Sequence, residues 1–412
     1  MLPTFWELRR AAWLQRKKTF STPGREALIE QVQHNLDAVE SGENHSLVLK
    51  GDYGEGKTHF LNIVFNYAQQ KNFAVSFVVL SKETPFNRLD RVYPKVVAGT
   101  YLPGEQEPGF EMILRDIRPG SDTAEKLLDF ARNELHPKIF YVLQNYLMAG
   151  DTYQQYLLYG DLAGNWLPIS QLKSLNKLNF GRSARIERFR LKENSWDYFR
   201  FLAYLFKMRG LAGWVILFDE FELVGTLGLI TRSEAYANLA RFLFPEDGKK
   251  LTSTGAVFSI ASRFWLDILL GERRQDIEEV PNKLFLKGER QKAELVRRAL
   301  NALLQNTVTL ETLPGREVYR MLAAVKDLHS KAYGWEPDID LEKIWEATKH
   351  DRLRTKIRYM LEYLDLKYLY REEPVVTTGD LEETSLEEAP VGENEDLPDD
   401  KENLKTLFDN SF

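Results

Sequence analysis

A glycine-rich octapeptide constrains this chain more than any other feature of its sequence. Residues 51–58, GDYGEGKT, fit the pattern G-x-x-x-x-G-K-[ST] at every fixed position. The apolar segment Ser46–Lys50 predicts a buried strand before the octapeptide, and the periodicity of Lys57–Gln70 predicts a helix after it. A strand, a glycine loop and a helix in this order are typical of a phosphate-binding loop (Walker A).

Each part of this loop has an expected task. The glycines let successive backbone N–H groups curl around phosphate oxygens, and the helix N-terminus adds positive potential. Lys57 would reach the β- and γ-phosphates, and the Thr58 hydroxyl would bind Mg²⁺. The residues that we expect to contact the nucleotide are Gly51, Asp52, Tyr53, Gly54, Glu55, Gly56, Lys57, Thr58 and His59.

A second motif (Walker B) supplies the carboxylates that such a loop requires. The apolar run Trp214–Phe218 predicts a strand, and Asp219 and Glu220 follow it directly. Asp219 would hold Mg²⁺ through its water shell, and Glu220 would orient and polarise the attacking water. An acidic turn at a strand end is common by itself. Combined with the glycine loop, it favours nucleotide hydrolysis over binding alone.

Two more predicted strands complete the expected fold class. The first, Val75–Leu80, closes a βαβ unit, which predicts an α/β fold with a parallel sheet covered by helices. The second, Gly255–Ala261, ends before Ser262 at the same sheet edge. Ser262, with Ser259 behind it, is a candidate for contact with the γ-phosphate or the water. An ordinary strand-end hydroxyl is an equally good interpretation.

The length of 412 residues exceeds the roughly 250–300 at which one core stops growing, so we expect more than one folded part. We divide the chain into N-terminal helices (1–45), a P-loop ATPase core (46–287) with a helical insertion (110–210), a helical lid domain (288–370) and a disordered acidic tail (371–412). Further helices are expected at Glu7–Lys18, Arg25–Val39, Glu111–Ile117, Ala124–Glu134, Lys138–Ala149, Trp196–Arg209 and Arg232–Phe244, with a less regular stretch at 160–190.

Charge is unevenly distributed along the chain. The net charge is −6, but residues 371–412 hold 14 acidic and 3 basic residues, or −11, which leaves +5 for the rest. This composition predicts a disordered tail. The apolar residues near its end (Leu404, Leu407 and Phe408) suit docking onto a basic partner or shielding of the chain's own basic surface; a solubilising tail without a partner is the alternative.

Basic residues cluster at Arg16–Lys18, at Arg297–Arg298 and within 182–190, where Arg182, Arg185, Arg188 and Arg190 alternate with apolar residues. Phe180 and Phe189 interleave with the last cluster, as in surfaces that bind nucleic acid. A solvated, salt-bridged loop is the other interpretation.

Several chemistries are not expected. The chain has no cysteine, which excludes disulfides and thiolate chemistry, and its six histidines lack metal-ligand spacing. The longest apolar runs are strand-sized, and the N-terminus lacks a signal-peptide pattern. We therefore expect a cytoplasmic protein without membrane contact.

Several segments together resemble the ATP-binding proteins of bacterial BREX-type phage-defence loci (BrxC/BrxD-like). They are PGREALIEQV, GDYGEGKTHFL, VVLSKETPFNRLDRVYPKVV, GDLAGNWL, WVILFDEFELV and DRLRTKIRYMLEYLD, and they span about Phe20 to Leu366. More distantly, the chain is similar to initiator-type (Orc/Cdc6-like) AAA+ ATPases. The resemblance implies an AAA+-like fold with a C-terminal helical lid.

The resemblance also implies roles for particular arginines. Arg354 matches the lid arginine that senses the γ-phosphate, with Arg352 and Arg358 close to it in sequence. Arg273 and Arg274 match the location of an arginine finger given in trans; solvated surface charges are the alternative for each. Ser262-Arg263 departs from the commoner Thr-Pro pair.

The expected function is Mg²⁺-dependent ATP hydrolysis by a protein that acts on or with a nucleic-acid complex in anti-phage defence. DNA, a helicase or nuclease partner and a homo-oligomer are the candidate partners. A slowly hydrolysing, ATP-gated switch or scaffold that recruits such a partner is the alternative. No base-reading motif separates ATP from GTP.

Overall fold

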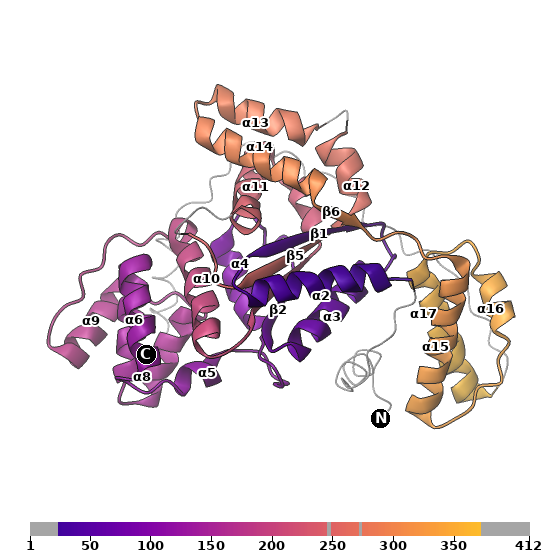
Figure 1. The fold of residues 1–412 in the computed structure, drawn as a ribbon, viewed down its shortest axis with the longest axis horizontal. Coiled ribbons are helices and arrows are strands. Elements are labelled where there is room, and N and C mark those ends of the chain that lie inside the picture. Colours follow the sequence, from indigo (N-terminus) through magenta and orange to yellow (C-terminus); the bar gives the residue numbers. More distant parts are fainter. Residues whose placement is uncertain (1–23, 245–248, 272–273, 372–412) are drawn as a thin grey trace, which may run out of the picture.

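The computed structural model describes residues 24–244, 249–271 and 274–371 of the chain. The expected helix Glu7–Lys18, the basic cluster Arg16–Lys18, Arg273 and the acidic tail beyond residue 371 lie outside the described residues. The described part is a mixed α/β structure built around one six-stranded sheet (Figure 1). No helix within it is long and apolar enough to cross a membrane.

The sheet has the strand order β3-β2-β4-β5-β1-β6. Its strands are β1 (His45–Gly51), β2 (Phe73–Val79), β3 (Thr100–Tyr101), β4 (Gly213–Asp219), β5 (Thr254–Ala261) and β6 (Thr307–Thr309). All neighbouring strands are parallel except β2 and β3. β5 pairs with both β1 and β4, so the three strand ends that carry the predicted site residues lie at one edge of the sheet.

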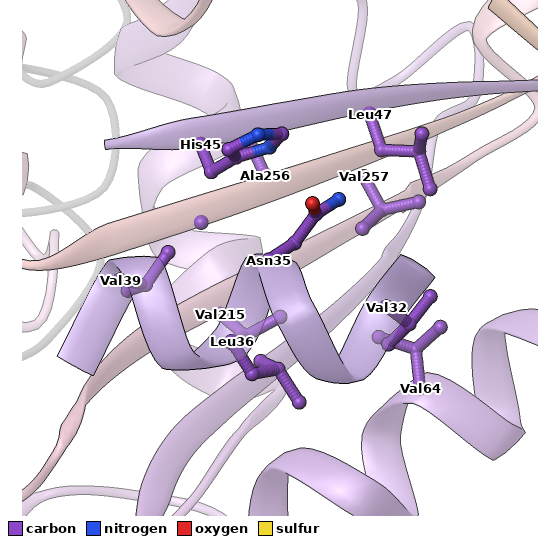
Figure 2. A pocket seen from close by; sticks show the side chains of 11 residues that line it. Val32, Asn35, Leu36, Val39, His45, Leu47, Val64, Val215, Ala256 and Val257 are labelled. Atoms are coloured by element: carbon purple, nitrogen blue, oxygen red, sulfur yellow. The ribbon is translucent and has the colours of Figure 1, made fainter. Parts of the chain in front are cut away.

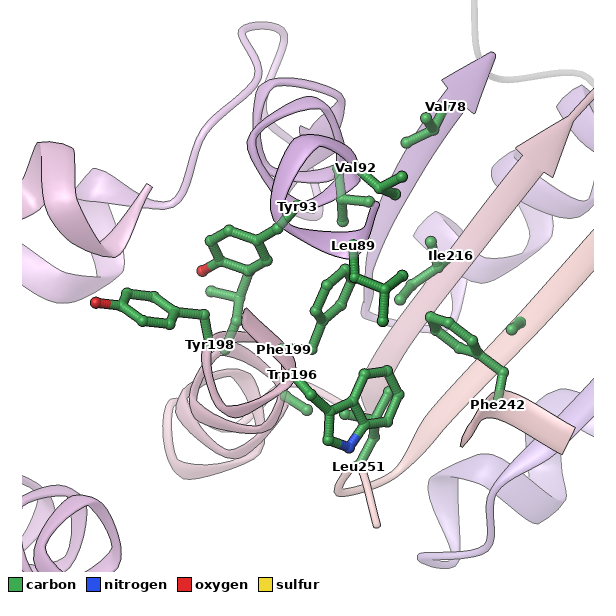
Figure 3. Packing of buried hydrophobic residues seen from close by; sticks show 14 of the residues in the cluster. Val78, Leu89, Val92, Tyr93, Trp196, Tyr198, Phe199, Ile216, Phe242 and Leu251 are labelled. Carbon is green, nitrogen blue, oxygen red and sulfur yellow. The ribbon is translucent and has the colours of Figure 1, made fainter. Parts of the chain in front are cut away.

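Helices cover both faces of the sheet, as the sequence predicts. Alternate strand residues such as Leu49 and Val257 pack under α2 (Glu26–Glu40) and α3 (Lys57–Gln70). The opposite face packs against α4 (Leu89–Ala98), α10 (Leu191–Met208) and α11 (Leu229–Leu243). Figure 3 shows the second face, where aromatic residues of α10 and α11 lie over β2 and β4. Burial on both faces explains why these strands are almost continuously apolar.

The helical insertion forms a lobe beside the sheet (Figure 1). It comprises α5 (Glu111–Arg115), α6 (Asp122–Glu134), α7 (Pro137–Met148), α8 (Thr152–Leu162) and α9 (Ile169–Phe180), and it leads into α10. The stretch 160–190 is more regular than expected, because it contains the end of α8 and all of α9. Only residues 163–168 and 181–190 of this stretch are without helix or strand.

A buried ion pair organises the insertion. Asp161 accepts hydrogen bonds from Lys138 Nζ at 2.6 Å, from the Tyr198 hydroxyl at 2.6 Å and from the Leu167 backbone N–H at 2.7 Å. Both charged side chains are buried, and the ammonium lies 4.5 Å from the centre of the Phe189 ring. Asp161 belongs to the segment GDLAGNWL, and these contacts give that segment a structural role.

The predicted domain boundary at residue 288 falls between two helices that pack in one core. Helices α13 (Asp276–Leu286) and α14 (Arg290–Gln305) share the hydrophobic core of the sheet, and β6 is its edge strand. A three-residue strand is too short to give a periodic signal in the sequence. The helices that follow, α15 (Gly315–Tyr333), α16 (Leu341–Ala347) and α17 (Leu353–Tyr370), have a separate small core of Leu322, Ile344, Met360 and Leu364. We call them the C-terminal helices.

A small cavity lies between α2 and the sheet (Figure 2). Its volume is about 20 Å³, and its walls are mostly valine and leucine, with Asn35 and His45 as the larger polar residues. This volume has room for about one water molecule. The cavity is a packing feature beneath α2, and the predicted site lies elsewhere, at the carboxyl edge of the sheet.

Candidate nucleotide-binding site

The glycine loop joins β1 to α3 in the predicted way. Gly54 and Gly56 have φ angles of 86° and 93°, a left-handed conformation that favours glycine. Gly56 precedes α3 without a side-chain cap, so the first-turn N–H groups of this helix have no capping side chain in the described structure. The open helix start and the left-handed glycines fit a phosphate group.

Lys57 is held close to the loop. Its side chain is buried, and Nζ donates hydrogen bonds to the carbonyl oxygens of Gly51 at 3.0 Å and Asp52 at 3.2 Å. The ammonium therefore lies within the turn of the loop, where phosphate oxygens would bind. Thr58 and His59, on the first turn of α3, are exposed, which places His59 at the rim of the site.

Thr58 and Asp219 connect the two sequence motifs. The Thr58 hydroxyl donates a hydrogen bond to Asp219 Oδ2 at 2.6 Å, across 161 positions of sequence. Asp219 is buried at the end of β4, and its Oδ1 accepts from the Glu220 backbone N–H at 3.1 Å. An oxygen pair of this kind fits Mg²⁺, which takes one or two protein ligands together with phosphates and water. No group of three or more His, Asp or Glu residues in the described ranges could hold a metal.

Glu220 has an unusual backbone conformation at this edge of the sheet. Its φ is 61°, which is rare for a residue with a side chain and is often found at functional sites. Burial raises the pKa of its carboxyl group, and the negative charge of Asp219 raises it further. The positive charges of Lys57 and Arg354 act in the opposite direction.

Glu222 is a site residue that the sequence reasoning missed. It lies on the short helix η1 (Phe221–Thr226), is 7% exposed and shares a side-chain hydrogen bond with Glu220. Burial, and then the charge of Glu220, raises the pKa of Glu222 to about 7. The charge of Glu220 thus disfavours ionisation of Glu222, while the hydrogen bond with Glu222 favours ionisation of Glu220. The third acidic residue in the run Asp219–Glu222 was the available signal, because carboxylates gather at this strand end.

The residues at the end of β5 lie where the sequence placed them. Ser259 is fully buried, and its hydroxyl has no hydrogen-bond partner in the described structure. Ser262 is half-buried and begins the short helix α12 (Ser262–Phe264). A hydrogen bond from the Ala261 backbone favours ionisation of Glu222, so β5 contacts the acidic pair. Arg263 forms an ion pair with Asp267 at 3.0 Å.

The start of α17 contacts the glycine loop. The Arg354 backbone N–H donates to the Gly54 carbonyl at 3.1 Å, and its guanidinium donates to the Tyr53 hydroxyl at 2.9 Å. A Cβ at Gly54 would lie 3.4 Å from Arg352 Cβ and 3.5 Å from Arg354 Cβ. Arg358 lies one turn further along the helix and is exposed. The structure thus brings Arg354 to the loop.

Two further charged side chains, Arg25 and Arg274, interact with segments of the site. Arg25, at the start of α2, and Glu55 are each 8% exposed, and their charges favour each other's ionised forms while burial opposes them. Arg274 donates a hydrogen bond to the Gly225 carbonyl of η1 in its own chain. The first interaction is a charge attraction between the start of α2 and the loop, and the second is a hydrogen bond to the short helix that follows the acidic pair.

This architecture is compatible with the P-loop class of nucleotide-binding proteins: a mostly parallel sheet flanked by helices, a glycine loop after β1 and an acidic pair after β4. Residues 19–116 match the sequence model of the family described as BREX system ATP-binding protein BrxC/D. The match covers about a quarter of the chain, including the glycine loop and SKETPFNRLDRVY, and it confirms the BrxC/BrxD-like resemblance there. No curated protein matches the chain.

Proposed function

We propose that this protein is a Mg²⁺-dependent ATPase of AAA+-like architecture that acts with a nucleic-acid complex in BREX-type phage defence. The observation that carries the enzymatic part is the hydrogen bond of 2.6 Å between Thr58 and Asp219, because it joins the loop and the acidic pair into one site. The family match over residues 19–116 supports ATP as the nucleotide and defence as the context. The proposal includes a cytoplasmic location, where ATP and phage DNA would both be encountered.

Each site residue has a task in this proposal. The loop N–H groups and Lys57 would bind the phosphates, and Thr58 and Asp219 would hold Mg²⁺. When bound, the ion would neutralise charge that develops on the phosphate oxygens. Glu220 would accept a hydrogen bond from the attacking water and orient it toward the γ-phosphate. Ser262, with Ser259 behind it, is the proposed polar contact from β5.

The contact between Arg354 and the loop supports a lid role for the C-terminal helices. Arg354 hydrogen-bonds Tyr53, and its charge lowers the pKa of Glu220, so it is close to both halves of the site. A nucleotide bound in the loop would offer the guanidinium a phosphate in place of the tyrosine hydroxyl. ATP binding would therefore change how the C-terminal helices contact the core.

Steady-state ATP hydrolysis with Mg²⁺, measured with and without DNA, tests this function. We expect turnover by the wild-type protein that DNA increases and that both Lys57→Ala and Glu220→Gln abolish. Glu336→Gln is the matched control, because Glu336 is an exposed glutamate on the C-terminal helical part and outside the site. Turnover that survives in both site variants would contradict the proposal.

A slowly hydrolysing switch that recruits a helicase or nuclease is the second candidate. The observation in its favour is that Arg274, one of the two expected trans arginines, donates to the carbonyl of Gly225 in its own chain. A site without a trans arginine hydrolyses slowly until a partner supplies one. Tight ATP binding with negligible turnover, with or without DNA, would favour this candidate.

A further inference from the structure

A strongly basic surface lies on the helical insertion, on α9 and the segment that follows it. Between residues 173 and 192 the chain has seven basic residues and one acidic residue, Glu187. Three arginines of this stretch, Arg182, Arg185 and Arg188, are exposed. We call these three residues the arginine row.

The segment that carries the arginine row is fixed to the insertion. The Arg182 carbonyl accepts a hydrogen bond from Asn176 Nδ2 at 2.7 Å, and the Arg185 backbone N–H donates to the Tyr141 hydroxyl at 3.1 Å. Ala184 is buried, and Ile186 and Phe189 pack against the core of the insertion. The apolar residues of the segment are therefore buried or half-buried, while its three arginines are exposed on a segment that is anchored to the insertion.

The arginine row has no carboxylate partner in the described structure. Arg190 forms an ion pair with Glu193 at 2.9 Å, but no described Asp or Glu pairs with Arg182, Arg185 or Arg188. The interpretation of a salt-bridged loop therefore fits Arg190 and does not fit the other three. The six residue steps of the row span at most about 20 Å, at about 3.3 Å per residue. That length corresponds to about six nucleotide steps of 3.4 Å.

Two exposed tyrosines lie on α8, whose start contacts the end of α9. Tyr153 and Tyr156 of α8 are 68% and 69% exposed. The neighbouring Gln154 accepts a hydrogen bond from Asn179 at 3.4 Å, which places the start of α8 beside the end of α9, where Arg182 follows. Phe189, which the sequence suggested for this surface, packs instead against Lys138 and His136 in the insertion.

We propose that the arginine row binds the phosphate backbone of a nucleic acid, with Tyr153 and Tyr156 as stacking surfaces for unpaired bases. Guanidinium groups bind phosphate oxygens in a two-pronged geometry, and exposed aromatic rings beside them are typical of single-strand binding surfaces. This inference goes beyond the ATPase proposal, because the surface is on the insertion and needs no nucleotide. Single-stranded and double-stranded nucleic acids both offer phosphates to the arginines, but only single strands offer unpaired bases for stacking on the tyrosines.

The experiment measures the anisotropy of fluorescent single-stranded and duplex DNA with the full chain, without nucleotide, over a range of salt concentrations. The test variant is Arg182→Ala/Arg185→Ala/Arg188→Ala. The matched control is Arg316→Ala/Lys331→Ala/Lys343→Ala, which removes three exposed charges from the C-terminal helices. The control and the test variant therefore have the same net charge. Lys57→Ala separates this surface from the ATP site, because its DNA binding should equal that of the wild type even though its ATP binding is lost.

We expect the test variant to bind DNA at least about tenfold more weakly than the control. The slope of log K against log salt should fall by about 2.7 for duplex DNA, at about 0.9 for each lost phosphate contact. Tyr153→Ala/Tyr156→Ala should weaken single-strand binding about tenfold and leave duplex binding unchanged. If Tyr153→Ala/Tyr156→Ala binds single-stranded and duplex DNA as tightly as the wild type, base stacking on the tyrosines is wrong. The phosphate contact of the arginine row is still supported in that case if the arginine variant binds DNA more weakly than its control.

Two outcomes would overturn the proposal. Equal losses in the test and control variants would show that total charge, and no particular surface, attracts DNA. The absence of DNA binding by the wild type, together with crosslinks between residues 372–412 and the arginine row, would assign this surface to the chain's own acidic segment.

Discussion

Arg354 and Tyr53 join the C-terminal helices to the glycine loop. The Arg354 guanidinium donates a hydrogen bond of 2.9 Å to the Tyr53 hydroxyl and lies 5.5 Å from the centre of the tyrosine ring. The same residue donates its backbone N–H to Gly54. Tyr53 and Gly54 belong to the loop that would bind phosphate, so this loop is in direct contact with the start of α17.

Replacement of Arg354 tests this contact. We expect Arg354→Ala to lower kcat for ATP by about 10²-fold, the usual effect of losing one group that stabilises developing charge, and to change the Kd for ATP by less than tenfold. Arg358→Ala is the matched control, because Arg358 is exposed one turn further along α17. Steady-state kinetics and ATP titrations measure the two quantities. Equal effects of the two substitutions would contradict the assignment of Arg354.

Gly54 tests the left-handed backbone of the loop. Gly54→Ala should lower the free energy of unfolding by about 1–2 kcal/mol, the strain of a left-handed residue with a side chain, and should also weaken ATP binding. Gly42→Ala is the control, because Gly42 has φ 107° and open space around its would-be Cβ, away from the loop. Chemical denaturation and ATP titration give both values. A similar loss of ATP affinity in both variants would contradict a phosphate role for Gly54.

The carboxyl pair Glu220 and Glu222 predicts a pH dependence of turnover. Glu220 must be ionised to orient water, but the pKa of Glu220 is raised and that of Glu222 is raised to about 7. Turnover should therefore fall with decreasing pH, and the fall should begin at a higher pH than an ordinary glutamate would give. The hydrogen bond with Glu222 lowers the pKa of Glu220, so Glu222→Ala, which removes this bond, should move the acid limb of the pH–rate profile to higher pH. An unchanged acid limb in this variant would argue against the pairing.

The same raised pKa gives a prediction for stability. The ionised form of Glu222 is disfavoured in the folded protein, so the stability contributed by its protonated form is present at low pH and is lost as the pH rises through about 7. Glu222→Gln cannot ionise. Its Tm relative to the wild type should therefore increase between about pH 4.5 and about pH 7 and stay constant above that range. A constant difference in Tm over this range would contradict the raised pKa.

Asp161 should be essential for the fold and dispensable for the chemistry. Asp161→Asn leaves the buried Lys138 ammonium without its charged partner, and breaking a buried pair lowers stability by about 3–5 kcal/mol. Asp122→Asn, which breaks the exposed pair with Lys126, should have no measurable effect. Urea denaturation compares the variants. An equal stability of both variants would show that the Asp161 cluster does not anchor the insertion.

The sequence predicted the parts of this structure that strong local patterns define. The glycine loop, the buried strands and the amphipathic helix after the loop carry signals within about 15 residues, and α3 has the predicted bounds Lys57–Gln70. The acidic pair could be connected with the loop because parallel strands end at one sheet edge. The hydrogen bond between Thr58 and Asp219 agrees with that reasoning.

Features that depend on tertiary context were not predictable in this way. β6 has only three residues, and it becomes a strand because β1 offers a free edge. The burial of Glu222 depends on a short helical turn that follows β4 and on the neighbouring end of β5. Likewise, the mixed polar and apolar residues of α9 did not indicate a helix in the sequence. The position of α9 depends on buried contacts such as the hydrogen bond between Asn145 and Asn176.

The most direct test of the central claim is a single-turnover measurement of ATP bound to the wild type, Glu220→Gln and Lys57→Ala in the presence of Mg²⁺. Rapid filtration gives the bound ATP, and the released phosphate gives its hydrolysis. We predict that the wild type binds and hydrolyses ATP, that Glu220→Gln binds ATP and retains it intact, and that Lys57→Ala does not bind it. Hydrolysis by Glu220→Gln at the wild-type rate, or equal ATP binding by Lys57→Ala and the wild type, would contradict the account.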